Sequence, residues 1–393
     1  MKKVSKLQLF SLILFGFILS LFLLEGFLRI TTSGQRWVNS HYVEISSAFP
    51  ELEALIDDTQ NTPPHKYYDE FLYAPGPVAL EHINFTEYYS SRLTPDSVPL
   101  PEAENIVWTF GGSTMENTET TDRLTIANTL AKKFNNSLGP THVKNFGSGG
   151  FISSYELIKF QKLLREIPES EHPDLAIFYD GYNDAQYGFQ FGPGSLQKDL
   201  SLKLQALVEQ QHGVMWLYST SNILTKYSRL WERTGARLVD YLLFPLPEPN
   251  PDFNNLRDTI RVYTSNVRMI QAICEAYNVD CFFILQPLIV TKGPLSELEQ
   301  NVLNQLEAHP RFGVEGSQFM RAFYDFVIDE LDENEDFIDA SNIMDGRDQP
   351  DFYDVGHTSA LTSPIIGEKL ADLMLERIVL DSNPPNAIGR LPR

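Results

Sequence analysis

The chain has 393 residues, 42% of them apolar and 12% aromatic, so it can bury one large core or two ordinary ones. Its formal net charge of −21 argues against the basic face that binding a nucleic-acid backbone requires. Acidic surfaces are also repelled by anionic lipid headgroups, so we expect contact with a membrane to come from something other than charge.

The N-terminus carries the first predicted element, a membrane anchor over residues 1–30. Lys2, Lys3 and Lys6 precede a nearly unbroken apolar run over residues 7–24. Eighteen helical residues span about 27 Å, close to the hydrocarbon thickness of a bilayer. By the positive-inside rule the lysines remain in the cytoplasm and the rest of the chain is extracytoplasmic.

A cleaved signal peptide is the alternative, and it would leave the protein secreted. Such a peptide usually has a shorter apolar core that is followed directly by small residues. Here Glu25, Phe27 and Arg29 follow the core, and the first cluster of small residues comes only at 31–34. The sequence therefore favours an uncleaved, single-pass anchor.

Residues 31–104 are mixed in character and rich in aromatic side chains. Pro63-Pro64 and Pro75-Gly76-Pro77 indicate turns. We expect a membrane-proximal segment with short strands that packs on the domain that follows.

From residue 105 short apolar runs alternate with segments of helical spacing. Predicted strands cover 105–110, 142–146, 174–180, 281–287 and 336–341, and predicted helices cover 121–134, 153–167, 257–278 and 363–379. This alternation predicts an α/β fold, with a mostly parallel sheet covered by helices on both faces. In such folds the chemistry lies at the carboxyl ends of the strands.

Residues 185–256 are too many for a connection between a strand and a helix in a compact domain, so they predict an insertion. The insertion is interpreted either as a lid or substrate wall, or as a structural elaboration at the sheet edge. The candidate side chains for substrate contact in and beside it are Tyr182, Phe189, Phe191 and Trp216.

The two cysteines, Cys274 and Cys281, allow a disulfide in an extracytoplasmic domain or two buried thiols, and we favour the thiols. Neither cysteine has metal-ligand spacing and the histidines are scattered, so no metal site is predicted. The acidic run at 329–341 lacks the spacing of a calcium loop and is interpreted as a solvated helix end.

Four strand ends carry residues with catalytic potential. Ser113 follows the first strand, a glycine-rich loop at 147–150 follows the second, Asn183 follows the third, and Asp354 and His357 precede the last helix. Each signal is weak alone, because turns commonly use serine, glycine and asparagine.

Together these residues supply every group needed for acyl transfer. Ser113 is the predicted nucleophile, His357 its general base, and Asp354 the group that orients the imidazole. The N–H groups of Ser113 and Gly150 and the side-chain amide of Asn183 form the predicted oxyanion hole.

The four stretches, GGST (111–114), NFGSGG (145–150), GYND (181–184) and DVGH (354–357), resemble in order the blocks of the SGNH (GDSL-type) hydrolase superfamily. The resemblance implies a three-layer α/β/α sandwich with a five-stranded parallel sheet, within a catalytic domain over 105–393. It also implies ester hydrolysis without a cofactor. One departure is that Gly112 stands where the family usually has aspartate, which puts the local geometry in question.

Anchored members of the superfamily edit acyl groups on cell-surface polysaccharides, so the resemblance implies an O-acyl, especially O-acetyl, esterase acting on extracytoplasmic carbohydrate. The alternatives are a lipid esterase or thioesterase, a polysaccharide O-acyltransferase, and a non-catalytic carbohydrate-binding scaffold. The expected partners are therefore an acylated carbohydrate or lipid, and a membrane through the N-terminal helix.

Overall fold

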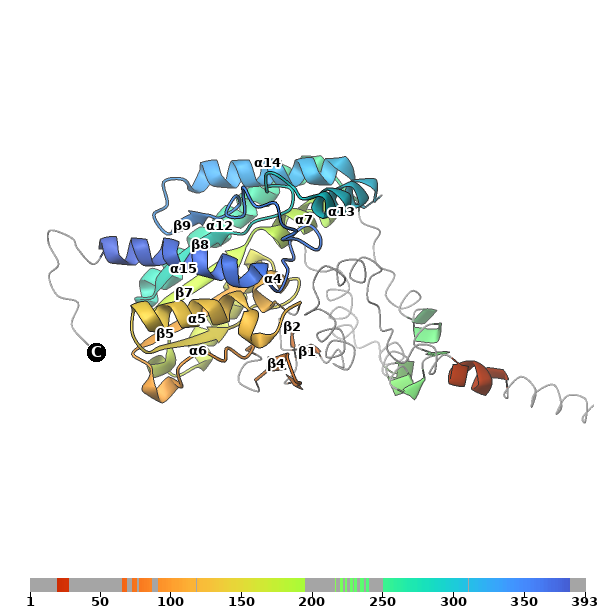
Figure 1. Cartoon of the computed structure of the whole chain (residues 1–393), viewed down its shortest axis with the longest axis horizontal. Coiled ribbons are helices and arrows are strands. Elements are labelled where there is room, and N and C mark those ends of the chain that lie inside the picture. Colours follow the sequence, from red (N-terminus) through yellow and green to blue (C-terminus); the bar gives the residue numbers. More distant parts are fainter. Residues whose placement is uncertain are drawn as a thin grey trace, which may run out of the picture. The chain divides into compact units, whose positions relative to one another are not determined.

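The computed structural model describes residues 20–27, 66–68, 73–75, 78–86, 91–117, 119–194, 250–309 and 311–381, together with single helical residues and short turns between 216 and 239. The chain forms two compact units (Figure 1). Unit 1 comprises residues 1–38 and 196–248, and unit 2 comprises residues 39–195 and 249–393.

Unit 2 is built on a five-stranded sheet. Its strands are β5 (Asn105–Gly111), β6 (Thr141–Asn145), β7 (Leu175–Asp180), β8 (Asp280–Leu285) and β9 (Phe337–Asp339). Their order is β6-β5-β7-β8-β9, and every neighbouring pair is parallel. The predicted α/β fold with a five-stranded parallel sheet is thereby confirmed. The chain passes from β5 to β6 on one side and then to β7 on the other, so the strand order reverses between β5 and β7, where open α/β sheets commonly bind ligands.

Helices cover both faces of this sheet (Figure 1). One face carries α5 (Ile126–Ser137) and α15 (Thr362–Asp381), and the other carries α6 (Ser153–Glu166), α7 (Tyr182–Phe191), α12 (Leu256–Tyr277), α13 (Glu297–Ala308) and α14 (Gly313–Leu331). A single turn, α4 (Ser113–Glu116), follows β5. Two separate hydrophobic cores result, one on each side of the sheet.

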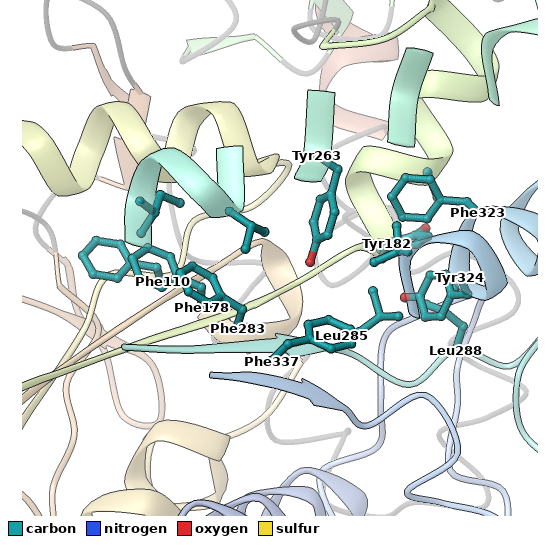
Figure 2. Close-up of a cluster of buried hydrophobic side chains, with 14 of the residues drawn as sticks. Phe110, Phe178, Tyr182, Tyr263, Phe283, Leu285, Leu288, Phe323, Tyr324 and Phe337 are labelled. Atoms are coloured by element: carbon teal, nitrogen blue, oxygen red, sulfur yellow. The ribbon is translucent and has the colours of Figure 1, made fainter. Parts of the chain in front are cut away.

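Aromatic side chains dominate the core beneath α6 and α12. Phe110, Phe178 and Phe283 occupy paired positions on β5, β7 and β8, and their rings stack at 4.9 and 5.5 Å between centroids. Figure 2 shows these three rings in a row beside the larger cluster that includes Tyr263 and Phe323. Each such ring buries a large apolar area, and offset stacking adds to its contribution. The strands that carry the candidate site residues are therefore firmly fixed.

The segment before β5 is described in part. β1 (Lys66–Tyr68) pairs with β2 (Tyr73–Pro75), and β3 (Val78–Ala79) pairs with β4 (Asn84–Phe85). The backbone N–H of Arg92 donates to the carbonyl of Asn145 at 2.9 Å, so the chain just before β5 lies along β6.

The helices that were not predicted from the sequence are α4, α7, α13 and α14. The predicted helix at 121–134 begins later, at Ile126, because the Thr125 side chain accepts from the N–H of Asn128 and caps the helix there. The boundaries of the other predicted elements agree with the structure within two or three residues.

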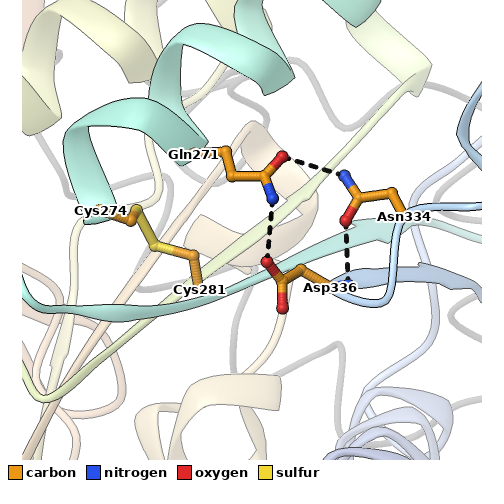
Figure 3. Close-up of a disulfide and its surroundings, with 5 residues drawn as sticks. All are labelled: Gln271, Cys274, Cys281, Asn334 and Asp336. Carbon is orange, nitrogen blue, oxygen red and sulfur yellow. Dashed lines mark hydrogen bonds between the residues drawn. A yellow bond between two sulfur atoms is a disulfide. The ribbon is translucent and has the colours of Figure 1, made fainter. Parts of the chain in front are cut away.

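The preference for two free thiols was wrong, because Cys274 and Cys281 form a disulfide. α12 ends at Tyr277, Asn278 adopts a left-handed conformation with φ of 55°, and β8 begins at Asp280. This tight turn brings the two Cα atoms to 6.4 Å, within the range that a disulfide needs. Figure 3 shows the bridge between α12 and β8. Beside it Gln271 bonds both Asn334 and Asp336, at 3.3 Å each.

Most of the predicted membrane anchor lies outside the described residues. Its described part, residues 20–27, is helical. Among the helices that the structure describes, none has the length and apolar character needed to cross a bilayer.

Candidate active site

Ser113 lies at the carboxyl end of β5, as predicted. The strand ends at Gly111, Gly112 is the N-cap, and Ser113 is the first residue of α4, with a partly exposed side chain. The N–H of Ser148, in the glycine-rich loop after β6, donates to the carbonyl of Gly111 at 3.0 Å. The serine loop and the glycine loop are thus joined by their backbones.

The structure brings His357 and Asp354 to Ser113. His357 Nε2 lies 2.6 Å from Ser113 Oγ, and His357 Nδ1 lies 2.7 Å from Asp354 Oδ2. The backbone N–H groups of Gly356 and His357 donate to the other oxygen, Asp354 Oδ1, at 3.0 and 2.8 Å. Both carboxylate oxygens are therefore used to hold the ring, which leaves Nε2 facing the hydroxyl.

Asn183 also reaches the serine loop. Its Nδ2 donates to the carbonyl of Phe151 at 2.7 Å, and a Cβ placed on Gly112 would lie only 2.3 Å from that same Nδ2. The Asn183 amide thus occupies the space that a side chain at position 112 would need. The amide has a second N–H beyond the one bound to Phe151.

The glycine loop lies against Ser113. A Cβ on Gly149 would be 3.9 Å from the Cβ of Ser113, and Gly150 has a positive φ of 79° that favours glycine. In the part of the chain that the structure describes, the N–H groups of Ser113 and Gly150 donate to no acceptor. Two backbone donors and the amide of Asn183 therefore come from the loops that meet at Ser113.

The four candidate substrate-contact residues have different positions. Tyr182 is buried and its ring packs edge-on against the His357 imidazole, with 6.0 Å between centroids, so it supports the histidine. Phe189 was a wrong choice, because it is 1% exposed and packs on Phe319 inside the core. Phe191 is partly exposed at the end of α7, and Trp216 lies in unit 1 with 69% of its surface exposed.

Charge around the site favours a protonated imidazole. Burial alone lowers the pKa of His357, but the Asp354 carboxylate, and next the Glu119 carboxylate, raise it above its ordinary value. Glu119 Oε1 lies 3.8 Å from His357 Nε2. Burial would raise the pKa of Asp354, but the adjacent His357 and its hydrogen bonds lower it instead. The pair is therefore held as imidazolium and carboxylate over a wider pH range than isolated groups would be.

Glu116 is a second carboxylate near Ser113 that sequence reasoning missed. Its Oε2 is 2.9 Å from the position of a Cβ on Gly149, and it accepts a hydrogen bond from that residue's N–H. Burial, and next repulsion from Glu119, raises the pKa of Glu116 to about 7. The Glu116 side chain is therefore partly protonated, and so partly neutral, near neutral pH.

Arg92 also escaped the sequence analysis, although it is fully buried beneath the serine loop. Its guanidinium donates to the carbonyls of Glu116, at 2.8 Å, of Asn117, and of Thr120, at 2.6 Å. Its Nε bonds Asp122 Oδ1 at 3.0 Å. One side chain from the segment before β5 thus fixes the backbone that follows α4. No sequence signal connects the two, because they meet only in the fold.

Lys292 fixes the backbone of the loop that carries His357, as Arg92 fixes the loop after Ser113. Its buried Nζ lies 2.8 Å from Glu299 Oε2, 2.9 Å from Asp351 Oδ2 and 2.9 Å from the carbonyl of Gln349. The side chains of all three charged residues are 0–1% exposed. A Ser296–Glu299 capping box begins α13 at the same place. The cluster fixes the chain immediately before Asp354 and His357.

No group of three or more His, Cys, Asp or Glu side chains arranged to hold a metal ion occurs among the residues that the structure describes.

No family model matches the chain, and no curated protein matches it. Solved structures of similar fold include a psychrotrophic esterase from Pseudoalteromonas sp., at 11% identity, 70% coverage of this chain, 100% of that chain and a TM-score of 0.38. An acetylxylan esterase from Geobacillus stearothermophilus has 11% identity, coverages of 70% and 94%, and a TM-score of 0.35. A GDSL-like lipase from Bacteroides thetaiotaomicron has 12% identity, coverages of 70% and 89%, and a TM-score of 0.35.

Proposed function

We propose that the protein is a serine ester hydrolase with Ser113 as nucleophile, His357 as general base and Asp354 as the orienting carboxylate. The observation that carries the proposal is the continuous chain of contacts from Ser113 Oγ to His357 Nε2, 2.6 Å, and from His357 Nδ1 to Asp354 Oδ2, 2.7 Å. These are the distances at which a base removes a hydroxyl proton and a carboxylate stabilises the resulting imidazolium.

In the first step Ser113 Oγ attacks the ester carbonyl while its proton moves to His357 Nε2. The carbonyl π bond opens, and the oxygen becomes an oxyanion. The N–H groups of Ser113 and Gly150 and the Asn183 amide are the proposed donors to this oxyanion. Imidazolium then gives its proton to the leaving alcohol as the C–O bond breaks, which leaves an acyl-Ser113 ester.

A water molecule repeats the sequence in the second half of the reaction. His357 takes a proton from the water, whose oxygen attacks the acyl carbon, and then returns the proton to Ser113 Oγ as the acid departs. Asp354 remains ionised throughout, which agrees with the lowered pKa of its carboxyl group.

For the substrate we propose an O-acyl, especially O-acetyl, ester on extracytoplasmic carbohydrate, handled by a single-pass membrane protein whose N-terminus is cytoplasmic. This finer proposal is supported by the predicted N-terminal anchor and by the resemblance of the four sequence blocks. An O-acyltransferase would use the same residues with a sugar hydroxyl in place of water.

The test measures hydrolysis of p-nitrophenyl esters from acetate to decanoate by the full-length protein in detergent. Ser113→Ala should lower kcat/KM by about a thousandfold or more, because the nucleophile is lost. Ser265→Ala, which changes a partly exposed serine on α12, is the matched control and should retain full activity. A fluorophosphonate probe should label the protein with Ser265→Ala but not the Ser113→Ala variant.

The outcomes separate the possibilities. Activity restricted to short esters supports the acetyl esterase, whereas a preference for decanoate points to a lipid substrate. Labelling without hydrolysis, followed by acyl transfer to an added sugar, would identify a transferase. Absence of both labelling and hydrolysis would refute the catalytic proposal.

A further inference from the structure

Lys159 is a further buried cation, on α6 beside the glycine loop, and the proposed reaction steps do not use it. The residue is 5% exposed, although a lysine usually directs its ammonium into water. Burial lowers the pKa of Lys159 to about 8, while the carboxylates of Glu116, and next of Glu156, favour the charged form. The ammonium therefore remains mostly protonated near neutral pH, and such a buried charge needs partners.

The ammonium contacts both ends of the glycine loop. Its Nζ donates to the carbonyl of Phe146 at 2.9 Å. It also lies 5.6 Å from the centroid of the Phe146 ring and 5.3 Å from that of the Phe151 ring, within the range of a cation–π contact. Phe146 directly precedes the glycine-rich stretch at 147–150, and Phe151 directly follows it. One side chain therefore holds the two ends of the loop that carries Gly150.

The position of the ammonium is set by α6. Helical side chains lean toward the N-terminus of their helix, so a long side chain at position 159 reaches back to the loop that precedes α6. The helix begins at Ser153, whose N–H and Oγ donate to the two carboxylate oxygens of Asp184 at 3.0 and 2.6 Å. Asn266 on α12 donates to Ser153 Oγ at 2.8 Å. The start of α6 is thus tied to α7 and α12, which fixes the helix from which Lys159 extends.

The two ends of the loop in turn contact the elements that carry the proposed oxyanion donors. The carbonyl of Phe151 accepts from Asn183 Nδ2 at 2.7 Å, so a shift of Phe151 would move that amide. At the other end the N–H of Phe146 donates to the carbonyl of Thr109 on β5 at 2.8 Å. Gly150 lies between these two anchors. A displacement of the loop would therefore move the Gly150 N–H and the Asn183 amide together.

We propose that Lys159 is a positioning residue for the oxyanion hole, because its ammonium holds Phe146 and Phe151 where the Gly150 N–H and the Asn183 amide can donate to one oxygen. The inference rests on the proposed serine hydrolase mechanism. Lys159 acts through the loop and not on the substrate. Its loss should therefore weaken stabilisation of the tetrahedral oxyanion and leave binding of the ground-state ester unchanged.

The test uses the full-length protein in detergent, hydrolysis of p-nitrophenyl acetate, and two aryl ketones that differ only in fluorine. With the trifluoromethyl ketone, Ser113 Oγ bonds to the carbonyl carbon, its proton passes to His357 and the carbonyl oxygen becomes a stable oxyanion. The corresponding methyl ketone binds without this addition. The inhibition constant of the trifluoromethyl ketone therefore reports stabilisation of the oxyanion, whereas that of the methyl ketone reports binding of the ground state.

The variants are Lys159→Met and, as the matched control, Lys144→Met. Methionine keeps an apolar stem without the charge or the N–H donors. Lys144, on β6, is 7% exposed, and its Nζ lies 3.3 Å from Glu171 in the short helical turn before β7. We expect Lys159→Met to lower kcat/KM and to weaken binding of the trifluoromethyl ketone by the same factor, about 10- to 100-fold. The methyl ketone should bind as before, and the control should change none of the three values.

Lys159→Gln keeps an N–H donor for the Phe146 carbonyl and should recover part of the loss. It also takes the place of Lys159→Met if that variant does not fold. Equal losses in Lys159→Met and Lys144→Met would overturn the inference. Equal weakening of both ketones would overturn it as well, because Lys159 would then act on binding of the ground state. If the parent protein binds both ketones equally and hydrolyses no ester, the proposed serine hydrolase is refuted, and this inference with it.

Discussion

The loops that carry Ser113 and His357 are both fixed by a buried cation, but the two cations work differently. Arg92 binds three main-chain carbonyls and one carboxylate, so it holds the path of the serine loop directly. Lys292 binds two carboxylates and one carbonyl, so it holds the histidine loop through charge. The planar guanidinium suits several carbonyls in fixed directions, whereas an ammonium is a compact point charge that balances carboxylates.

This difference between the two cations predicts which kind of substitution destabilises each loop. Loss of charge should disturb the histidine loop most, because Glu299 would remain buried without a cation and Asp351 would keep only the partly exposed Arg347. The serine loop should instead be most sensitive to the shape of its cation. A cation without the several N–H groups of a guanidinium would leave some of the main-chain carbonyls without donors. Lys292→Met and Arg92→Lys test this contrast directly, and Gly112→Ala and Glu119→Gln test the site that the two loops form.

Lys292→Met should lower the free energy of unfolding by about 3–5 kcal/mol, because it leaves the buried Glu299 carboxylate without a cation and Asp351 with only Arg347. Urea denaturation followed by circular dichroism measures the change. Lys133→Met, which removes a cation from the exposed pair with Asp372, is the control and should change stability little. A loss for Lys292→Met as small as that of the control would contradict the role given to the charge.

Gly112→Ala should lower kcat by about 10²–10³, because the new methyl group displaces the Asn183 amide from the proposed oxyanion position. Ester hydrolysis at saturating substrate measures it. Asn183→Ala should have a similar effect, and the double variant should be no slower than Asn183→Ala alone, since both act on one donor. Additive losses would show that Gly112 acts in another way.

Arg92→Lys should lower the free energy of unfolding by about 1–3 kcal/mol, because an ammonium keeps the charge yet cannot reach three carbonyls and Asp122 together. Urea denaturation again gives the value. Lys292→Arg is the corresponding variant in the histidine loop, since it keeps the positive charge but replaces the compact ammonium with a planar guanidinium. If retained charge were sufficient in the serine loop, Arg92→Lys would be as stable as the parent protein.

Glu119→Gln should move the acidic limb of the kcat/KM profile to lower pH. His357 must be neutral to accept the serine proton, so activity rises with pH through the pKa of the imidazole. Removing the negative charge 3.8 Å from Nε2 lowers that pKa and extends activity toward acid. Glu102→Gln, which is exposed and lies before β5, should leave the profile unchanged. If the acidic limb did not move, Glu119 would not set the pKa of His357.

Much of unit 2 could be predicted from local patterns. The strands at 105–110 and 174–180 are short apolar runs bounded by polar residues, and α12 has a long amphipathic repeat. Parallel strand order then brings the ends of β5, β6 and β7 to one edge, so Ser113 and Asn183 were expected near each other. The disulfide was misjudged because residue type alone does not report the tight turn at Asn278.

Other parts of the site depended on distant packing. Phe189 stands in an aromatic, glycine-rich stretch that resembles a loop, but α7 continues to Phe191 and turns its ring into the core. Arg92, Glu119 and Lys292 carry no motif. Each acquires its role from a residue that is near in the fold but distant in sequence. Arg92 and Glu116 are 24 residues apart in the chain, and Lys292 and Asp351 are 59 residues apart.

By itself the sequence determined the alternation of strands and helices, the fold class and the candidate reactive groups, because these follow from local hydrophobic periodicity and from residue chemistry at strand ends. Only the tertiary structure decided how the groups meet. The 2.6 Å contact between Ser113 and His357, the need for glycine at 112 and the two buried cations all arise from packing between segments far apart in the chain. Such contacts are set by three-dimensional complementarity, which no local pattern encodes.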